Sequence, residues 1–157
     1  MIAFEVDRDD AWPEEAEALP ARCAVALEAL SLPEERGGEV SVLLATDDEV
    51  RALNAQWRGK DAATNVLSFP ADPVPGLPEE AQPLGDLALA FETCAREAEA
   101  KGVTLADHAA HLLVHGLLHL FGYEHGDGQA ARRMEALETR ALASLGIACP
   151  YEEEPAD

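Results

Sequence analysis

The feature that most constrains the fold of this chain is the apolar stretch LLVHGLLHLF at 112–121, which carries histidines at 115 and 119. Positions four residues apart lie one above the other on an α-helix, because the helix has 3.6 residues per turn. The leucines around them predict that the rest of this helix is core. Gly122 can adopt a positive φ, so we expect the helix to end there and the chain to turn back toward His125.

His115, His119 and His125 have the spacing of a metal site. Two imidazoles one turn apart can reach one ion, and the third would arrive from a different direction. Three imidazoles with an open fourth position are typical of catalytic zinc, whereas structural zinc usually has four protein ligands, often thiolates. The sequence therefore predicts one zinc ion per chain. The alternative reading is that these are ordinary core or surface histidines.

Two further histidines lie on the same predicted helix. His111 is one turn back on the same face, where it is an outer donor to the ligands, a competing ligand or inert. His108 is nearer the start of the helix, and we expect it to be exposed.

The rest of the chain predicts an α+β fold. Apolar runs with period two predict strands at 2–6, 39–45, 64–69 and 85–91. Helical spacing predicts helices at 19–32, 46–57, 92–101, 104–121 and 127–145, with Thr46 and Glu49 as a capping box. A proline-rich surface loop spans 70–83. Periodicity gives this order of strands and helices but not how the strands pair, and we expect the metal site at the end of the central 105–121 helix.

Length and charge limit the function classes. The 157 residues suit about one domain, so we expect a single domain at 1–150 and a frayed acidic tail at 151–157. No stretch approaches the roughly 18 uncharged residues of a membrane span, and no targeting segment is visible, which favours a cytoplasmic protein without a membrane partner. The net charge of −20 disfavours nonspecific binding to nucleic acid, although a local basic patch can still act within its own neighbourhood.

Three cysteines, Cys23, Cys94 and Cys149, are too few and too far apart for a disulfide framework. We interpret them as reduced thiols that fill the core.

Three segments of the chain resemble the YbeY family, which comprises bacterial metal-dependent endoribonucleases of ribosomal RNA maturation. They are NAQWRGKDAATNVLSFP at 54–70, LGDLALA at 84–90 and HGLLHLFGYEH at 115–125, in the order that the family has them. Two positions depart from the usual pattern, because Asn65 and Glu124 stand where many members have Asp. Neither change removes a predicted zinc ligand, but the first leaves open whether a carboxylate acts at position 65.

The resemblance implies a single-strand-specific endoribonuclease that processes the 3′ end of 16S ribosomal RNA and serves ribosome quality control. It implies an α+β fold with a small mixed sheet of about four strands packed with helices. It also implies that His115, His119 and His125 bind zinc and that Arg58 takes part in cleavage. It also implies RNA rather than DNA as substrate, and small-subunit ribosomal proteins and an assembly GTPase as partners.

The chemistry of these residues agrees with that role. A guanidinium can hold phosphoryl oxygens bidentately and keeps its proton near neutral pH. Zinc can polarise a phosphate or lower the pKa of a bound water to about 7. The sequence leaves open which route applies, and whether the RNA 2′-hydroxyl is the nucleophile. Near Arg58, we expect Arg51 and Lys60 to be solvated charges, and Trp57 to be a core anchor rather than a platform for stacking bases.

The sequence leaves two alternative functions open. A zinc peptidase of the H-E-x-x-H type has similar histidine spacing, but Gly116 stands where its general-base glutamate would be, and Glu124 is an uncertain substitute. A noncatalytic ribosome-assembly factor with structural zinc would tolerate the loss of Arg58 and would unfold when the metal is removed.

Overall fold

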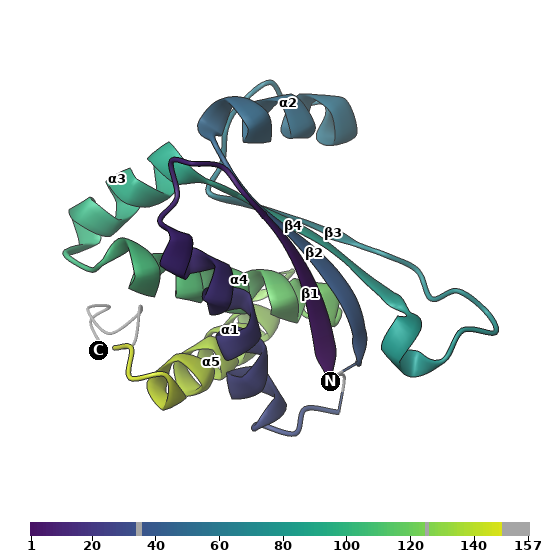
Figure 1. Ribbon diagram of the computed structural model, residues 1–157. Coiled ribbons are helices and arrows are strands. Elements are labelled where there is room, and N and C mark those ends of the chain that lie inside the picture. The colour runs from purple at the N-terminus through teal and green to yellow at the C-terminus, as the bar shows by residue number, and fades with distance from the viewer. Residues whose placement is uncertain (34–35, 125, 149–157) are drawn as a thin grey trace.

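Strands and helices follow the order that the sequence predicts (Figure 1). The computed structural model describes residues 1–33, 36–124 and 126–148. Within them the chain forms β1 (Ile2–Arg8), α1 (Leu19–Glu28), β2 (Gly38–Ala45), α2 (Asp47–Arg58), β3 (Val66–Pro70), β4 (Pro83–Ala90), α3 (Phe91–Lys101), α4 (Leu105–Leu120) and α5 (Gly128–Ser144). Short 3-10 helices occupy Glu14–Ala18 and Glu79–Ala81.

The strands described here form one mixed sheet in the order β1-β2-β4-β3. β1, β2 and β4 are parallel, and β3 pairs antiparallel to β4. The chain crosses from β1 to β2 through α1, because parallel neighbours need a long connection. The predicted α+β fold with a small mixed sheet is therefore confirmed.

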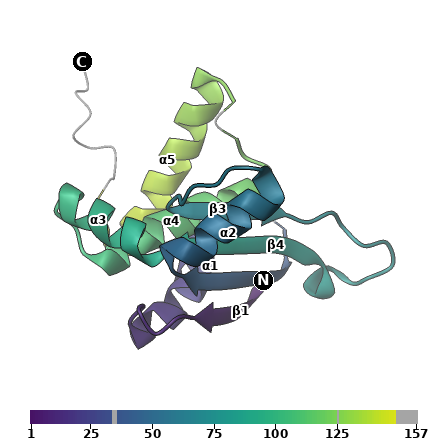
Figure 2. The same cartoon turned by 90° about the horizontal axis from the view of Figure 1, so that it is seen from above.

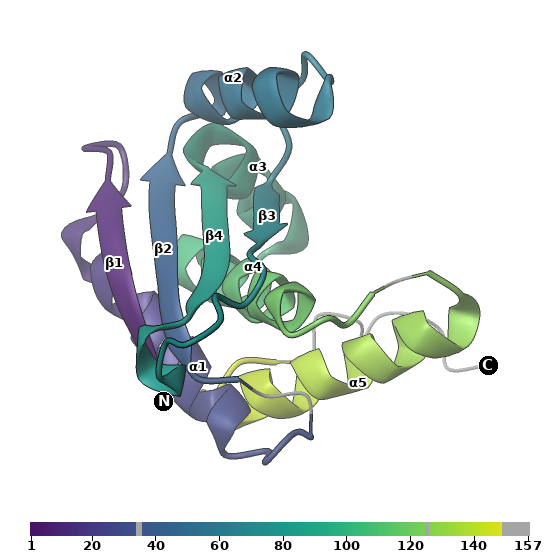
Figure 3. The same ribbon diagram turned by 90° about the vertical axis from the view of Figure 1, so that its right-hand side faces the viewer.

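Alternation along the strands gives the sheet two packed faces. Leu87 and Leu89 of β4 belong to the main core, which α1, α4 and α5 cover (Figure 3). Ala88 and Ala90 point to the other face and pack with Val50 of α2 in a smaller core. Figure 2 shows α5 extending away from the sheet beyond α4. α4 is thus held between the sheet and α5, and most of its side chains are buried.

Local hydrogen bonds explain where the helices begin and end. Thr46 and Glu49 form the predicted capping box, in which each side chain accepts from the other residue's backbone N–H. Thr104 caps α4 by accepting from the N–H of Asp107 at 3.0 Å. Gly102 ends α3 with a φ of 70°, a left-handed conformation that glycine adopts without strain.

Three boundaries or burial predictions were wrong. α1 ends at Glu28 rather than 32, and Ser31 has a φ of 52°, which a right-handed helix does not allow. β3 begins at Val66 rather than 64, because the side chain of Asn65 accepts from the N–H of Val66. Trp57 is not a core anchor but is 65% exposed, since it borders an open cleft of about 380 Å³ between α2 and the sheet.

The predictions for the cysteines, the acidic tail, the domain and membrane spans are tested to different extents. Cys23 and Cys94 are buried free thiols, as expected of core filler, and burial raises the pKa of each to about 12. Cys149 and the acidic tail at 151–157 lie outside the described residues. The assignment of 1–150 to one domain stays a prediction. Across the part of the chain that the structure describes, no helix has both the length and the apolar character to cross a membrane.

Candidate metal centre

His115 and His119 point their Nε2 atoms at the same place. These two atoms are 3.0 Å apart, and both side chains are half-buried on the last two turns of α4. The Nδ1 atom of His115 lies 2.6 Å from Oε2 of Glu138, and the Nδ1 atom of His119 lies 2.8 Å from the carbonyl oxygen of Tyr123. Each ring is therefore oriented by a contact at Nδ1, while its Nε2 atom faces the Nε2 atom of the other histidine.

This arrangement fits a metal ion. Histidines that bind metals usually donate the second ring N–H to a carboxylate or a backbone carbonyl, which fixes the tautomer and the ring plane. His115 and His119 have one partner of each kind. When each neutral ring carries its proton on Nδ1, both Nε2 atoms present a lone pair, and a cation between them can accept both. The donor set suits zinc, for which neutral imidazole is a common ligand.

The third predicted ligand, His125, lies outside the described residues. Gly122, which the sequence marked as the turn before it, has a φ of 106°. Within the described ranges, no three histidine, cysteine or carboxylate side chains form a cluster that could hold a metal. The structure thus brings together two of the three predicted ligands.

Arg58 borders the same cavity as His119, one of the two histidines. A cavity of about 470 Å³ is bordered by Arg58, Ser68, His119 and Glu124, among others. The guanidinium of Arg58 donates to the carbonyl oxygen of Ser68 at 2.8 Å and lies 5.4 Å from the centre of the Phe69 ring. Two segments that are about 60 positions apart in the sequence therefore meet at one hollow in the surface.

Two residues of this region were not predicted from the sequence. Arg36, in the loop before β2, also borders the Arg58 cavity, and no local motif marks it. Glu138 on α5 is completely buried, with Oε1 at 2.8 Å from Nε2 of His111. A signal for Glu138 existed, because it is an acid four residues from both Met134 and Leu142 on the buried face of α5.

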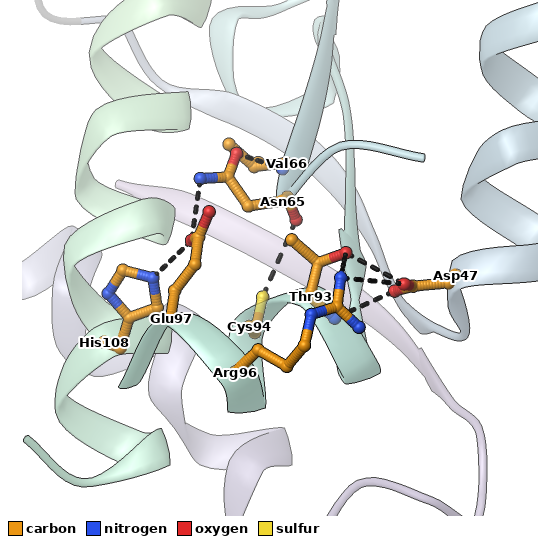
Figure 4. Close-up of polar contacts among 8 residues, drawn as sticks. All are labelled: Asp47, Asn65, Val66, Thr93, Cys94, Arg96, Glu97 and His108. Carbon is orange, nitrogen blue, oxygen red and sulfur yellow. Dashed lines mark hydrogen bonds and ion pairs between the residues drawn. The ribbon is translucent and has the colours of Figure 1, made fainter. Parts of the chain in front are cut away.

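His108 is buried, so the prediction that it is exposed was wrong. It exposes only 3% of its surface, because α3 packs against α4 at this point. Its Nε2 atom lies 2.7 Å from Oε1 of Glu97, which also accepts from the side-chain amide of Asn65 at 3.0 Å (Figure 4). Burial lowers the pKa of His108, against the opposing effect of Glu97. Asn65 thus acts as a donor here, a role that an ionised aspartate could not fill.

Gly116 faces the sheet. A Cβ atom at this position would lie 2.7 Å from Cδ2 of Leu87, well inside contact distance. The position is buried between α4 and β4, so a glutamate there would point into the core rather than toward the histidine pair. The geometry therefore gives no room for the general base of an H-E-x-x-H peptidase.

Comparison with known proteins decides the family. The family model described as Endoribonuclease YbeY matches residues 5–146. The chain belongs to the YbeY family. It is 50% identical over 163 residues to the Endoribonuclease YbeY of Paramagnetospirillum magneticum, with 98% of this chain and 99% of the relative covered. The Endoribonuclease YbeY of Erythrobacter litoralis is 58% identical over 119 residues, with 72% and 74% covered.

A solved structure supports the fold of this YbeY family member. The solution structure of TM1509 from Thermotoga maritima matches with a TM-score of 0.58 and 22% identity, and covers 100% of this chain and 99% of that one. The family model and the curated relatives confirm the predicted membership of the YbeY family. The zinc ion, its three ligands and the role of Arg58 stay predictions.

Proposed function

We propose that this chain is a cytoplasmic, single-strand-specific endoribonuclease of ribosomal RNA maturation, which acts on the 3′ end of 16S RNA and in ribosome quality control. In this proposal His115, His119 and His125 hold one zinc ion, and Arg58 binds the scissile phosphate. The observation that carries the proposal is that Arg58 and His119 border one cavity in a chain whose curated relatives are named Endoribonuclease YbeY.

The contacts of Arg58 support a phosphate-binding role. Its guanidinium has five N–H donors, and the bond to the Ser68 carbonyl together with the Phe69 ring limits its rotation. A guanidinium that is already oriented loses little rotamer freedom when a phosphate binds. Such a fork can hold two phosphoryl oxygens and stabilise the charge that develops on them during cleavage.

A zinc ion at the histidine pair would supply a Lewis acid for the phosphoryl oxygens or for a water molecule. Residues of the chain itself orient the two histidine rings that would hold the ion. Glu138 and the Tyr123 carbonyl fix the two rings, and the half-buried position of the rings limits competing water. Arg58, at the end of α2, binds the scissile phosphate at the same cavity.

Partner proteins belong to the same proposal. We infer small-subunit ribosomal proteins and an assembly GTPase as partners, because a chain with 31 acidic and 11 basic residues attracts RNA poorly by itself. A basic ribosomal protein would bring the RNA to the enzyme and offset that repulsion.

The test is cleavage of a labelled single-stranded RNA that spans the 3′ end of 16S RNA. Arg58→Ala is compared with Arg51→Ala, an exposed arginine of the same helix that pairs with Asp61 at 2.7 Å. We expect Arg58→Ala to cut about 10²–10³-fold more slowly with unchanged zinc content, and Arg51→Ala to cut normally.

Equal cutting by the native protein and both variants would refute the assignment of Arg58. If none of the three cuts RNA and yet ribosome maturation in cells survives the loss of Arg58, the noncatalytic assembly factor is the correct reading.

A further inference from the structure

Glu138 is a carboxylate in the buried core, where charged side chains are rare. It is the one acidic residue with no exposed surface among the residues that the structure describes, and it lies in the middle of the buried face of α5. An isolated buried carboxylate costs several kcal/mol, so such a group persists only where close partners compensate. Its partners identify its role.

Both oxygens of Glu138 contact histidines of α4. Oε2 lies 2.6 Å from Nδ1 of His115, and Oε1 lies 2.8 Å from Nε2 of His111. His111 therefore directs a ring nitrogen at the carboxylate. This contact explains why a third histidine lies on this face one turn before His115: it holds the carboxylate.

We propose that Glu138 is the positioning residue of the metal site. It holds the His115 ring so that Nε2 points at the metal position, and His111 fixes the carboxylate from its other side. The proposal rests on the metal site of the proposed function but not on RNA cleavage. It also makes the docking of α5 on α4 a condition for metal binding, because the carboxylate comes from α5.

The test measures the zinc affinity of purified full-length protein at one fixed pH, by competition with a coloured chelator. Glu138→Gln keeps the volume of the side chain but replaces one carboxylate oxygen by an NH₂ donor, so only one histidine keeps an acceptor. We expect its zinc affinity to fall about 10–100-fold, as is usual when such a partner of a ligand is lost. His111→Asn should cause a smaller fall, because it leaves the contact between Glu138 and His115 in place.

The matched control is Met134→Leu, one turn earlier on the same buried face of α5. This change alters core packing but leaves both carboxylate oxygens of Glu138 in place for the histidines, so zinc affinity should stay within twofold of the native value. Circular dichroism of each metal-free variant shows whether it is folded. A fall in affinity with Met134→Leu equal to that with Glu138→Gln would mean that Glu138 only packs α5, and would overturn the proposal.

The outcomes separate this inference from the proposed function. If the native protein binds no zinc, the metal site of the proposed function fails first. If the native protein binds zinc and folded Glu138→Gln binds it equally well, only the positioning role fails. Should Glu138→Gln not fold, Glu138→Asp retains the charge but is one methylene shorter. An unchanged zinc affinity in that variant would likewise refute the role.

Discussion

Arg36 and Arg58 both border the cavity that contains His119, although the chain has only 11 lysines and arginines. Phosphate contacts by arginine supply affinity that falls with salt, and each lost contact lowers the salt dependence. For single residues, the proposed function therefore predicts that Arg36 binds the RNA phosphate next to the one that Arg58 binds.

Arg36→Ala should weaken the binding of single-stranded RNA by about 1 kcal/mol, or roughly fivefold. The slope of log affinity against log salt should become shallower by about 0.7. Fluorescence anisotropy at several salt concentrations measures both quantities. Arg140→Ala, an exposed arginine of α5, serves as the control and should change neither. An Arg36→Ala slope equal to the native one would contradict the assignment.

Gly116→Glu would create the H-E-x-x-H sequence of a zinc peptidase. Because the new side chain would meet Leu87 in the core, we expect the free energy of unfolding to fall by about 3–5 kcal/mol. Urea unfolding measures this change. Gly128→Glu is the matched control, since Gly128 is exposed in the first turn of α5, where an acid is favourable. A stable Gly116→Glu variant would mean that position 116 does not face the sheet.

The sequence was informative about single residues where local geometry decides their place. The pairing of His115 with His119 follows from helical spacing alone, and the structure brings their Nε2 atoms within 3.0 Å. Burial that depends on a partner element was not predictable in the same way. α3 covers His108, and the histidines that contact Glu138 belong to α4, so these contacts do not follow from the local sequence. The spacing of apolar residues in α5 indicates only that position 138 is buried.

At the scale of elements, the packing of α3 on α4 depends on titratable groups. Partial burial alone would raise the pKa of Glu97, but hydrogen bonds from Asn65 and His108 lower it below its usual value. The pKa of His108 is also lowered, chiefly by burial. Both groups thus bind protons less readily in the folded chain than in the unfolded chain.

These directions predict a loss of stability in acid. The contribution of His108 is present above its unfolded pKa of about 6.5 and is lost as the pH falls through its folded pKa. The contribution of Glu97 is lost at lower pH, below about 4.3. Urea unfolding of metal-free protein from pH 7.5 to 5 should show the first loss, and His108→Gln should reduce it. An identical pH dependence in the two proteins would contradict the buried, neutral His108.

Elements were predictable to different degrees for physical reasons. Caps such as Thr46 with Glu49 are local, so α2 begins where the sequence indicates. The pairing of β3 with β4 at the edge of the sheet depends on contacts distant in sequence, so the strand order was not predicted and comes from the structure. α2 was expected to bury Trp57, but its last turn borders an open cleft instead.

At the scale of the whole molecule, the charge of −20 opposes the RNA that the cavity is proposed to bind. We expect the protein alone to bind single-stranded RNA with a Kd weaker than about 10⁻⁶ M at physiological salt, and a basic ribosomal protein to tighten this. Anisotropy with and without that protein measures the effect. Nanomolar binding by the isolated chain would show that the global charge does not govern its affinity.

The rate of RNA cleavage as zinc is added back to metal-free protein shows directly whether the histidine site holds a catalytic metal. If His115 and His119 hold a catalytic metal, the rate should rise from near zero to a plateau at about one zinc per chain. His119→Ala should remain inactive across the same titration while staying folded. Cleavage by the metal-free protein at the full rate, or a His119→Ala variant that cuts normally, would contradict the account.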